Sequence, residues 1–93
     1  MVITRADRDN RIVHEINAEP AAAEYARLIG ARVEDLTPAL FASHPPIVRI
    51  GGEHYARSIR TANDDGSLTF YDAIDEGVVM TLGETGDIIA SLE

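Results

Sequence analysis

Two tight-turn signals divide the second half of the chain into short β-type segments. Gly51-Gly52 suits a two-residue hairpin turn, and the stretch 63–66, Asn-Asp-Asp-Gly, ends on a glycine that can take a positive φ. The predicted strands are 47–50, 53–62, 67–71 and 78–82. Because strands joined by tight turns run in opposite directions, this half of the chain predicts an antiparallel sheet.

The first half predicts a β-hairpin followed by helices, and the end of the chain predicts one more helix. The hairpin strands are expected at 2–5 and 11–16, and the helices at 18–29, 33–43 and 86–93. The resulting order, ββ–αα–ββββ–α, predicts an α+β fold. We expect one domain over 1–93, with an antiparallel sheet of about five to six strands and helices packed on one face. This order is analogous to the PAS or profilin-like plan, an analogy that carries no function by itself.

Local signals predict where the helices begin and end and which side chains face inward. Asn17 is expected to cap the first helix and Gly30 to end it, and Thr37 is expected to cap a turn that starts at Pro38. The predicted inward residues of the two helices are Ala18, Ala21, Ala22, Tyr25, Leu28, Ile29, Val33, Leu36, Leu40 and Phe41, with Glu24 on the solvent side. In the strand 11–16, Ile12, His14 and Ile16 are expected to share the buried face.

Composition excludes several kinds of function. The chain has 93 residues, a net charge of −8 and no cysteine, which excludes disulfides and thiolate metal sites. All its cations are arginine, and the acidic balance argues against binding to a nucleic-acid backbone. No apolar run approaches the ~18 residues of a membrane span, and the first residues lack a signal-peptide layout. We expect a cytoplasmic protein that binds neither nucleic acid nor a membrane.

Four stretches, in collinear order, resemble the C-terminal region of FIST sensory proteins. They are IVHEINAEPA at 12–21, HYARSI at 54–59, NDDGSLTFY at 63–71 and AIDEGVVMTL at 73–82. Two positions depart from the family pattern: Ala18 stands where members often have glycine, and Asp72 where they often have cysteine. A FIST protein also has a large N-terminal half and further C-terminal sequence. The chain is therefore expected to be a fragment or a stand-alone relative.

The resemblance implies an input module of bacterial signal transduction without catalytic activity. FIST proteins occur beside histidine kinases, cyclases and chemotaxis modules, and are proposed to bind small ligands such as amino acids. Some members resemble haem-based nitric-oxide sensors, but we expect no haem in this fragment. Its expected partners are a small-molecule ligand, the missing FIST segments, and a histidine kinase or cyclase.

Arginines on the predicted strands are the candidate ligand-binding residues. Arg57 and Tyr55 share one face of the strand 53–62. A guanidinium can hold a carboxylate through two parallel hydrogen bonds while an aromatic ring covers the ligand's apolar side, which would suit an amino acid. Arg49 and Arg60 are further candidates. The alternative is that Arg57 lies on a solvent-exposed face or pairs with a nearby acidic side chain.

The remaining polar residues predict no metal site and no catalytic centre. The three histidines lack metal-type spacing, with His14 expected to be buried and neutral, His44 in a loop and His54 exposed. No constellation of base, nucleophile and oxyanion donors is visible, so we do not expect an enzyme. The alternative function is a structural or oligomerisation module, a possible homodimer. It is motivated by the small face at Ala21-Ala22 and by Ile88, Ile89 and Leu92 near the end of the chain.

Overall fold

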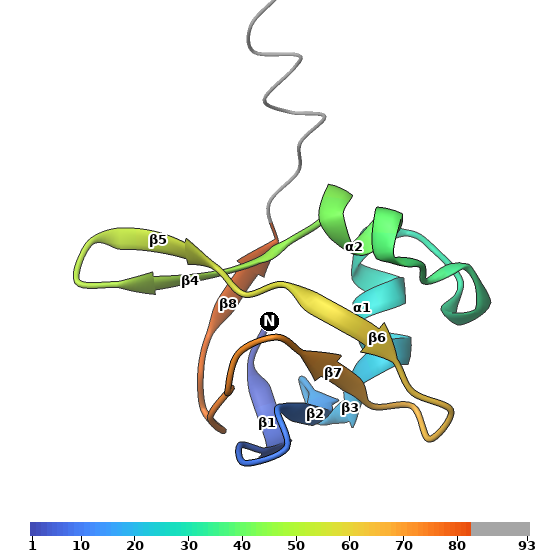
Figure 1. The fold of residues 1–93 in the computed structure, drawn as a ribbon, viewed down its shortest axis with the longest axis horizontal. Helices are drawn as coiled ribbons and strands as arrows, with labels where there is room; N and C mark the ends of the chain where they lie inside the picture. Colours follow the sequence, from blue (N-terminus) through green and yellow to red (C-terminus); the bar gives the residue numbers. More distant parts are fainter. Residues whose placement is uncertain (83–93) are drawn as a thin grey trace, which may run out of the picture.

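A computed structural model describes residues 1–82 and has a mixed α+β fold (Figure 1). Its strands are β1 Ile3–Asp7, β2 Ile12–Ile16, β3 Glu19–Pro20, β4 Pro46–Ile50, β5 Glu53–Ala56, β6 Ile59–Ala62, β7 Leu68–Phe70 and β8 Met80–Leu82. Its helices are α1 Ala21–Ile29, the 3-10 turn η1 Val33–Asp35 and α2 Pro38–Ser43. The predicted α+β class is confirmed. The helix expected at 86–93 lies outside the residues that the structure describes.

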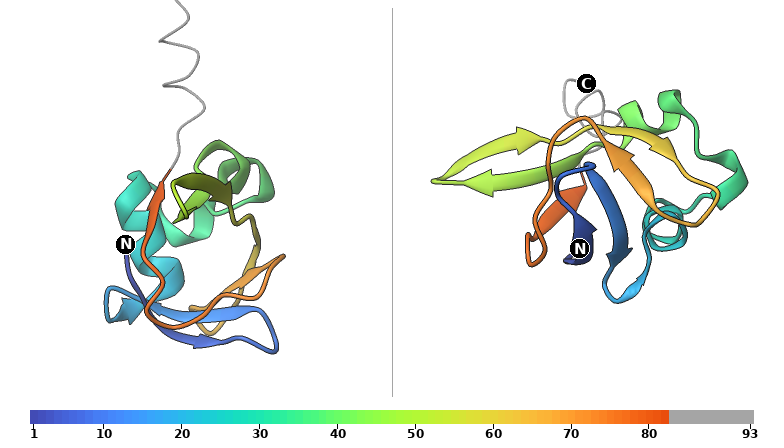
Figure 2. Two further views of the ribbon diagram at one scale, coloured as in Figure 1. Left: turned by 90° about the vertical axis from the view of Figure 1, so that its left-hand side faces the viewer. Right: turned by 60° about the horizontal axis from the view of Figure 1, so that its bottom comes forward.

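The strands form two antiparallel sheets where the sequence predicted one. The larger sheet has the order β1-β2-β7-β6, with β3 beside β2, and the smaller sheet has the order β5-β4-β8. Helix α1 packs against β2, and α2 packs against β6, so both helices cover the larger sheet. The β4–β5 hairpin projects from the body of the molecule (Figures 1 and 2).

The division into two sheets occurs at Arg57-Ser58, in the middle of the strand predicted at 53–62. The Arg57 N–H donates to the carbonyl of Pro46 on β4 at 2.8 Å, which continues the smaller sheet. The carbonyl of Ser58 accepts from the N–H of Tyr71, next to β7, at 3.1 Å. Two consecutive residues thus form backbone hydrogen bonds with different sheets, and the chain passes from the smaller sheet to the larger one between them.

Helix α1 begins three residues later than predicted, because Pro20 prevents an earlier start. A residue before proline is disfavoured from the helical region, so Glu19 cannot be helical, and Pro20 itself takes the position before the first helical residue. Asn17 does not cap the helix. It and Ala18 form a left-handed turn, with φ of 53° and 63°, and the Asn17 side chain instead accepts from the Val2 N–H at 2.8 Å.

The predictions for Gly30 and for Thr37 with Pro38 are confirmed, whereas the helix predicted at 33–43 is divided in two. Gly30 ends α1 in the left-handed conformation, with φ of 74°. The Thr37 hydroxyl caps α2 by accepting from the Leu40 N–H at 3.3 Å, with Pro38 in the first turn. Residues 33–35 form a separate 3-10 turn.

The core lies between the larger sheet, the helices and β8. Its fully buried side chains include Ile3, Val13, Ile16, Tyr25, Leu68, Phe70 and Met80. The rings of Tyr25 and Phe41 tilt against each other with centroids 5.8 Å apart, and the Tyr25 hydroxyl donates to the carbonyl of His44 at 2.8 Å. Burial raises the pKa of Tyr25 to about 12, so this hydroxyl remains a donor throughout the physiological range.

A β-bulge changes which side chains of β2 face the core, so the buried face predicted for this strand is wrong. Arg5 pairs with Glu15 and Ala6 with Val13, so His14 is the extra residue on β2. An extra residue reverses the alternation of faces, and the buried side chains on the two sides of His14 are therefore Val13 and Ile16. Ile12 and His14, which were expected to be buried, are half-buried.

Four of the residues assigned to the inner or outer face of the helices are placed wrongly. Ala18, expected inside, lies before α1 and is exposed. Leu28 and Val33, expected inside, are 38% and 44% exposed, whereas Glu24, expected in solvent, is buried. The inward stripe of α1 is centred on Ala21, Ala22, Tyr25 and Ala26. Glu24 tolerates burial because Arg27 and Asn17 donate hydrogen bonds to its carboxylate.

Replacing Gly66 with valine tests the predicted β6–β7 turn. Gly66 has φ of 89°, and an added Cβ would meet only the Cβ of Pro20 at an ordinary 3.7 Å. The cost therefore comes from the backbone, and we expect Gly66→Val to lower the free energy of unfolding by about 1–2 kcal/mol. Gly66→Asn should cost less, because asparagine tolerates positive φ better. Equal melting temperatures for wild type and the valine variant would contradict this turn geometry.

Candidate functional site

A hollow beneath the smaller sheet brings one predicted site residue together with a hydrophobic floor. It encloses about 140 Å³. Its lining consists of Val48, Ile50, Arg57, Ala73, Ile74, Asp75, Val78 and Met80. Val48, Ile74 and Met80 are buried, so the floor is apolar, and charged groups come only from Arg57 and Asp75. We call this hollow the Arg57 pocket.

Backbone pairing fixes the side of the hairpin on which Arg57 lies. Val48 pairs with Tyr55, and the Arg57 N–H bonds to Pro46, two residues further along both strands. Since side chains alternate along a strand, Tyr55 and Arg57 share the face that carries Val48. The Arg57 guanidinium lies 5.7 Å from the centroid of the Tyr55 ring and donates to the carbonyl of Ala56 at 3.3 Å.

Asp75 supplies an acidic group to the lining of the Arg57 pocket. Asp75 belongs to the connection between β7 and β8, and its carboxylate pairs with the guanidinium of Arg8 at 2.9 Å. Both side chains of this pair are more than 60% exposed, so water screens the attraction and the pair is readily exchanged for another partner. The lining of the pocket therefore includes one cation and one anion.

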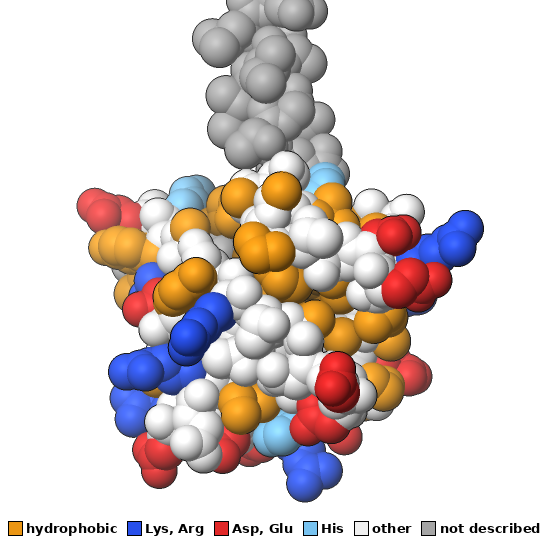
Figure 3. Space-filling view, turned by 45° about the vertical axis from the view of Figure 1, so that its right-hand side comes forward, with side chains coloured by type: hydrophobic (Ala, Val, Ile, Leu, Met, Phe, Trp, Pro, Cys, Tyr) orange, Lys and Arg blue, Asp and Glu red, His pale blue; other side chains and the backbone are white. Residues whose placement is uncertain are grey.

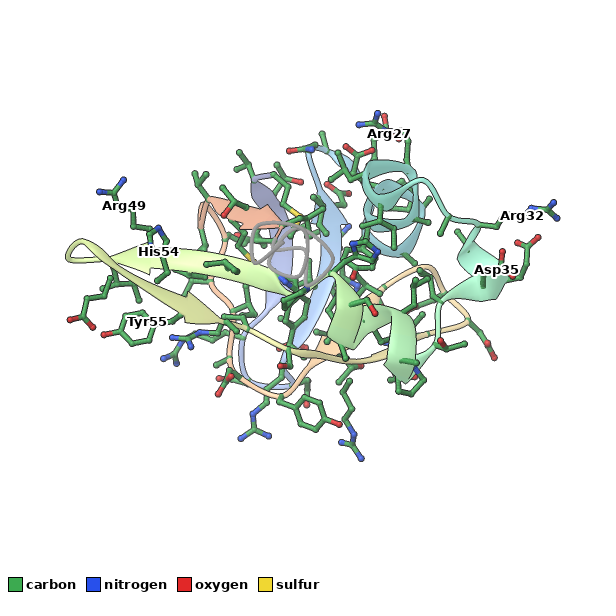
Figure 4. The ribbon with its side chains drawn as sticks, turned by 90° about the horizontal axis from the view of Figure 1, so that it is seen from above. Arg27, Arg32, Asp35, Arg49, His54 and Tyr55 are labelled. Atoms are coloured by element: carbon green, nitrogen blue, oxygen red, sulfur yellow. The ribbon has the colours of Figure 1, made fainter. Side chains whose placement is uncertain are left out.

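The other two predicted arginines lie away from the pocket. Figure 4 shows Arg49 and His54 on one side of the β4–β5 hairpin and Tyr55 on the opposite side, consistent with the cross-strand pairing of Arg49 with His54. Arg60 is exposed on β6, next to the buried Ile59, and belongs to the larger sheet. Of the four candidates, the structure brings together Arg57 and Tyr55.

Sequence reasoning missed the contribution of the β7–β8 connection to this hollow. Ile74 is buried and Asp75 is exposed, and both reach the Arg57 pocket from a loop without regular structure. The apolar pair Ala73-Ile74 between acidic residues is a weak local signal for a segment that folds back over a sheet. The pairing of β8 with β4, which places this loop, joins segments more than 30 residues apart in the sequence.

A second hollow, of about 550 Å³, is open and polar and lies beside the start of α1. It is lined by Asn17, Glu19, Ala23, Glu24 and Arg27. Arg27 donates to both oxygens of the Glu24 carboxylate, at 2.8 and 2.7 Å, and the Asn17 amide donates to the same group at 2.8 Å. These hydrogen bonds, first those of Arg27 and then that of Asn17, hold the pKa of Glu24 at about 2, below its ordinary 4.5.

This network predicts a stability loss at acid pH. Because the pKa of Glu24 is lowered on folding, the ionised carboxylate stabilises the folded state. This contribution to the free energy of unfolding is complete above about pH 4.5 and is lost as the pH falls toward about 2. At neutral pH we expect the melting temperature of wild type to exceed that of Glu24→Gln. Near pH 2 the two melting temperatures should converge. Thermal melts across this range check the prediction, and a constant difference at all pH values would contradict it.

A third hollow, of about 210 Å³, separates α2 from the edge of the larger sheet. Its lining is Pro38, Phe41, Ala42, Ser58, Ile59 and Tyr71. Figure 3 shows the face that comes forward when the molecule is turned by 45° from the view of Figure 1. On this face, hydrophobic side chains gather in the upper part and charged side chains lie mostly at the margins. This hollow has no charged lining residue, and its polar side chains are the hydroxyls of Ser58 and Tyr71.

The histidines of residues 1–82 lie apart from the three hollows. Among residues 1–82, no group of three or more His, Asp or Glu side chains could hold a metal. No histidine lines any of the three hollows. His44 lies at the end of α2 and His54 is exposed on β5, as expected for both, while His14 occupies the bulge on β2. No helix of residues 1–82 is long and apolar enough to cross a bilayer.

The fold and the pocket define a small α+β domain with a hollow of about 140 Å³ whose lining includes one arginine and one aspartate. The chain belongs to the FIST C domain family, whose model matches residues 21–93. FIST C domains are a non-catalytic sensory family linked to signal transduction. Three of the four resembling stretches lie inside the matched range, and the first, at 12–21, lies almost wholly before it. Comparison with curated proteins and with solved structures gives no significant match.

Proposed function

We propose that this chain is a small-ligand-sensing module of a bacterial signal-transduction protein, and that it binds an amino acid or a related carboxylate in the Arg57 pocket. The observation that carries the proposal is the presence of Arg57 in the lining of a largely apolar hollow. A sensory family sets the class of function. The ligand class comes from the chemistry of the pocket.

Each part of an α-amino acid has a counterpart at this site. The guanidinium of Arg57 can take the ligand carboxylate through two charge-assisted hydrogen bonds. Asp75 can take the ammonium group in exchange for its exposed pair with Arg8. Val48, Ile74 and Met80 offer an apolar surface for a side chain. Because the hollow, at about 140 Å³, is smaller than the ~300 Å³ at the lower end of ligand pockets, it favours short aliphatic side chains.

Thermal-shift measurements with a panel of small compounds test the ligand class. We expect aliphatic amino acids and short carboxylates to raise the melting temperature, with a stabilisation of about 2.7 kcal/mol at a ligand concentration of 100 Kd. The matched control is the amine that lacks only the carboxylate, such as isobutylamine for valine, which should give no shift. Equal shifts with acid and amine, or no shift with any compound, would contradict the proposal.

A second candidate function is a structural or oligomerisation module that packs against other FIST segments or against itself. The observation that favours it is the exposure of large apolar side chains. Tyr71 and Val79 are each 62% exposed, and Tyr71 borders the third hollow. The histidine kinase or cyclase partner and the cytoplasmic location are further parts of the proposal, and both follow from the family alone.

A further inference from the structure

Strand β5 has an outer edge that no other strand of residues 1–82 covers. It is the terminal strand of the smaller sheet, all four of its residues are exposed, and its hairpin projects from the body of the molecule (Figures 1 and 2). An uncovered edge presents a row of backbone donors and acceptors that can pair with another strand. What pairs with it is decided by the direction of those groups and by the side chains beside them.

Backbone pairing shows which residues of β5 point outward. The two-residue turn pairs Ile50 with Glu53, Val48 pairs with Tyr55, and the Arg57 N–H bonds to Pro46. Since the backbone groups of successive residues point to opposite edges of a strand, Glu53, Tyr55 and Arg57 bond toward β4. The N–H and C=O groups of His54 and Ala56 therefore face the open edge.

Two copies of this edge fit each other in antiparallel register about Tyr55. In that register His54 of one copy exchanges both backbone hydrogen bonds with Ala56 of the other, and Tyr55 lies directly opposite its own counterpart. Glu53 then lies opposite Arg57 of the second copy, and the reverse pair is formed as well. Two neighbouring registers also pair the outward backbone groups. A register centred on His54 places Glu53 opposite Tyr55, and one centred on Ala56 places Arg57 opposite Tyr55. Neither places opposite charges across from each other.

The charges of this edge are free for such a pair within the described chain. The ion pairs formed among residues 1–82 are Arg8–Asp75, Arg27–Glu24 and Arg32–Glu34, so neither Glu53 nor Arg57 has a charged partner there. Both side chains already lie along the Tyr55 face, since the Tyr55 hydroxyl donates to Glu53 at 3.1 Å and Arg57 lies over the Tyr55 ring. Opposite charges at directly facing positions stabilise paired strands.

We propose that a second copy of this chain is the partner of β5, and that the two smaller sheets join into one continuous six-stranded sheet across a two-fold axis at Tyr55. The interface is self-complementary, as two-fold symmetry requires. It is argued from the edge of β5, but it uses the Arg57 guanidinium that is also assigned to the ligand carboxylate, so a bound ligand would compete with the Glu53–Arg57 pair. Its test is therefore made with ligand-free protein.

Cysteine crosslinking tests the register, and the chain offers a clean background because it contains no cysteine. The two-fold axis brings the two positions 55 to about 4.5 Å between Cα atoms, within the range for a disulfide. We expect Tyr55→Cys to form a covalent dimer on mild oxidation. The matched control, His54→Cys, should remain largely uncrosslinked, because its two copies lie about 8 Å apart in this register. Equal crosslinking of both variants, or of neither, would overturn the register.

Charge-reversal variants, made without introduced cysteines, test whether the partner of β5 is a second copy of the chain. By sedimentation across a concentration series, wild type should show a reversible monomer–dimer equilibrium. Glu53→Arg and Arg57→Glu should each weaken it by at least about ten-fold, because each places like charges opposite each other twice. An equimolar mixture of the two variants should associate again, since the reversed positions then face opposite charges. A wild type that remains monomeric, or a mixture no tighter than the single variants, would overturn the proposal even if every variant folds.

Discussion

Phe70→Ala is expected to remove about 3–5 kcal/mol of stability, the largest effect of any single substitution considered for this chain. Phe70 is 1% exposed and lies opposite Ile59 in the β6–β7 pair. Its N–H donates to the carbonyl of Arg11 at 2.8 Å, so β7 is joined to both of its neighbours at this residue. A cavity here cannot close without moving both strands. Because small domains have only about 5–15 kcal/mol of stability in total, the variant should be largely unfolded at moderate temperature.

Urea unfolding measures this loss, and the adjacent residue supplies the control. Tyr71 is 62% exposed, so Tyr71→Ala should change the free energy of unfolding by no more than about 0.5 kcal/mol. The urea midpoint should fall strongly for Phe70→Ala and hardly at all for Tyr71→Ala. Comparable midpoints for the two variants would contradict the assignment of Phe70 to the core and Tyr71 to the surface.

Arg57→Ala is expected to weaken ligand binding by about 10- to 100-fold. Hydrogen bonds to charged groups are each worth about 1.5–3 kcal/mol, and a carboxylate in the Arg57 pocket would lose its only cationic partner. Arg57→Lys should fall between wild type and the alanine variant, because an ammonium group keeps the charge but not the paired geometry. Calorimetric titration with the best amino acid from the thermal-shift panel gives the three dissociation constants.

Arg49→Ala is the matched control for this effect. It removes an arginine from the same hairpin, but from the opposite side to Tyr55 (Figure 4). We expect its dissociation constant to equal that of wild type. Stability should be little changed in either variant, because the Arg57 guanidinium donates only to the carbonyl of its neighbour Ala56 and Arg49 is exposed. Equal weakening by both variants would mean that net charge, and not the pocket, governs binding.

The sequence predicted those features that a few consecutive residues determine. Gly30 and Thr37 mark helix ends, and Gly66 marks a turn, because each has a local conformational or hydrogen-bonding reason to be there. The α+β class follows from the order of such elements. The helix start at Ala21 was also accessible, since Pro20 forbids the earlier start that the apolar spacing favoured.

The features that were missed depend on contacts between distant segments. Nothing local to Arg57-Ser58 indicates that the chain leaves one sheet for another, because that follows from hydrogen bonds to Pro46 and Tyr71. The bulge at His14 depends in the same way on the register of β1 against β2. For the candidate site, strand alternation correctly placed Arg57 beside Tyr55, but the floor and Asp75 come from the β7–β8 connection, whose position is set by β8 pairing with β4.

An NMR titration of the chain with a short aliphatic amino acid tests the central claim most directly, because it reports where the ligand binds as well as whether it binds. We predict that saturating ligand shifts the amide signals of Arg57, Ile74 and Met80, while those of Ala23 beside α1 and Ala42 on α2 stay unchanged. Shifts concentrated at Ala23 or Ala42, or an unchanged spectrum at high ligand concentration, would contradict a carboxylate site at Arg57.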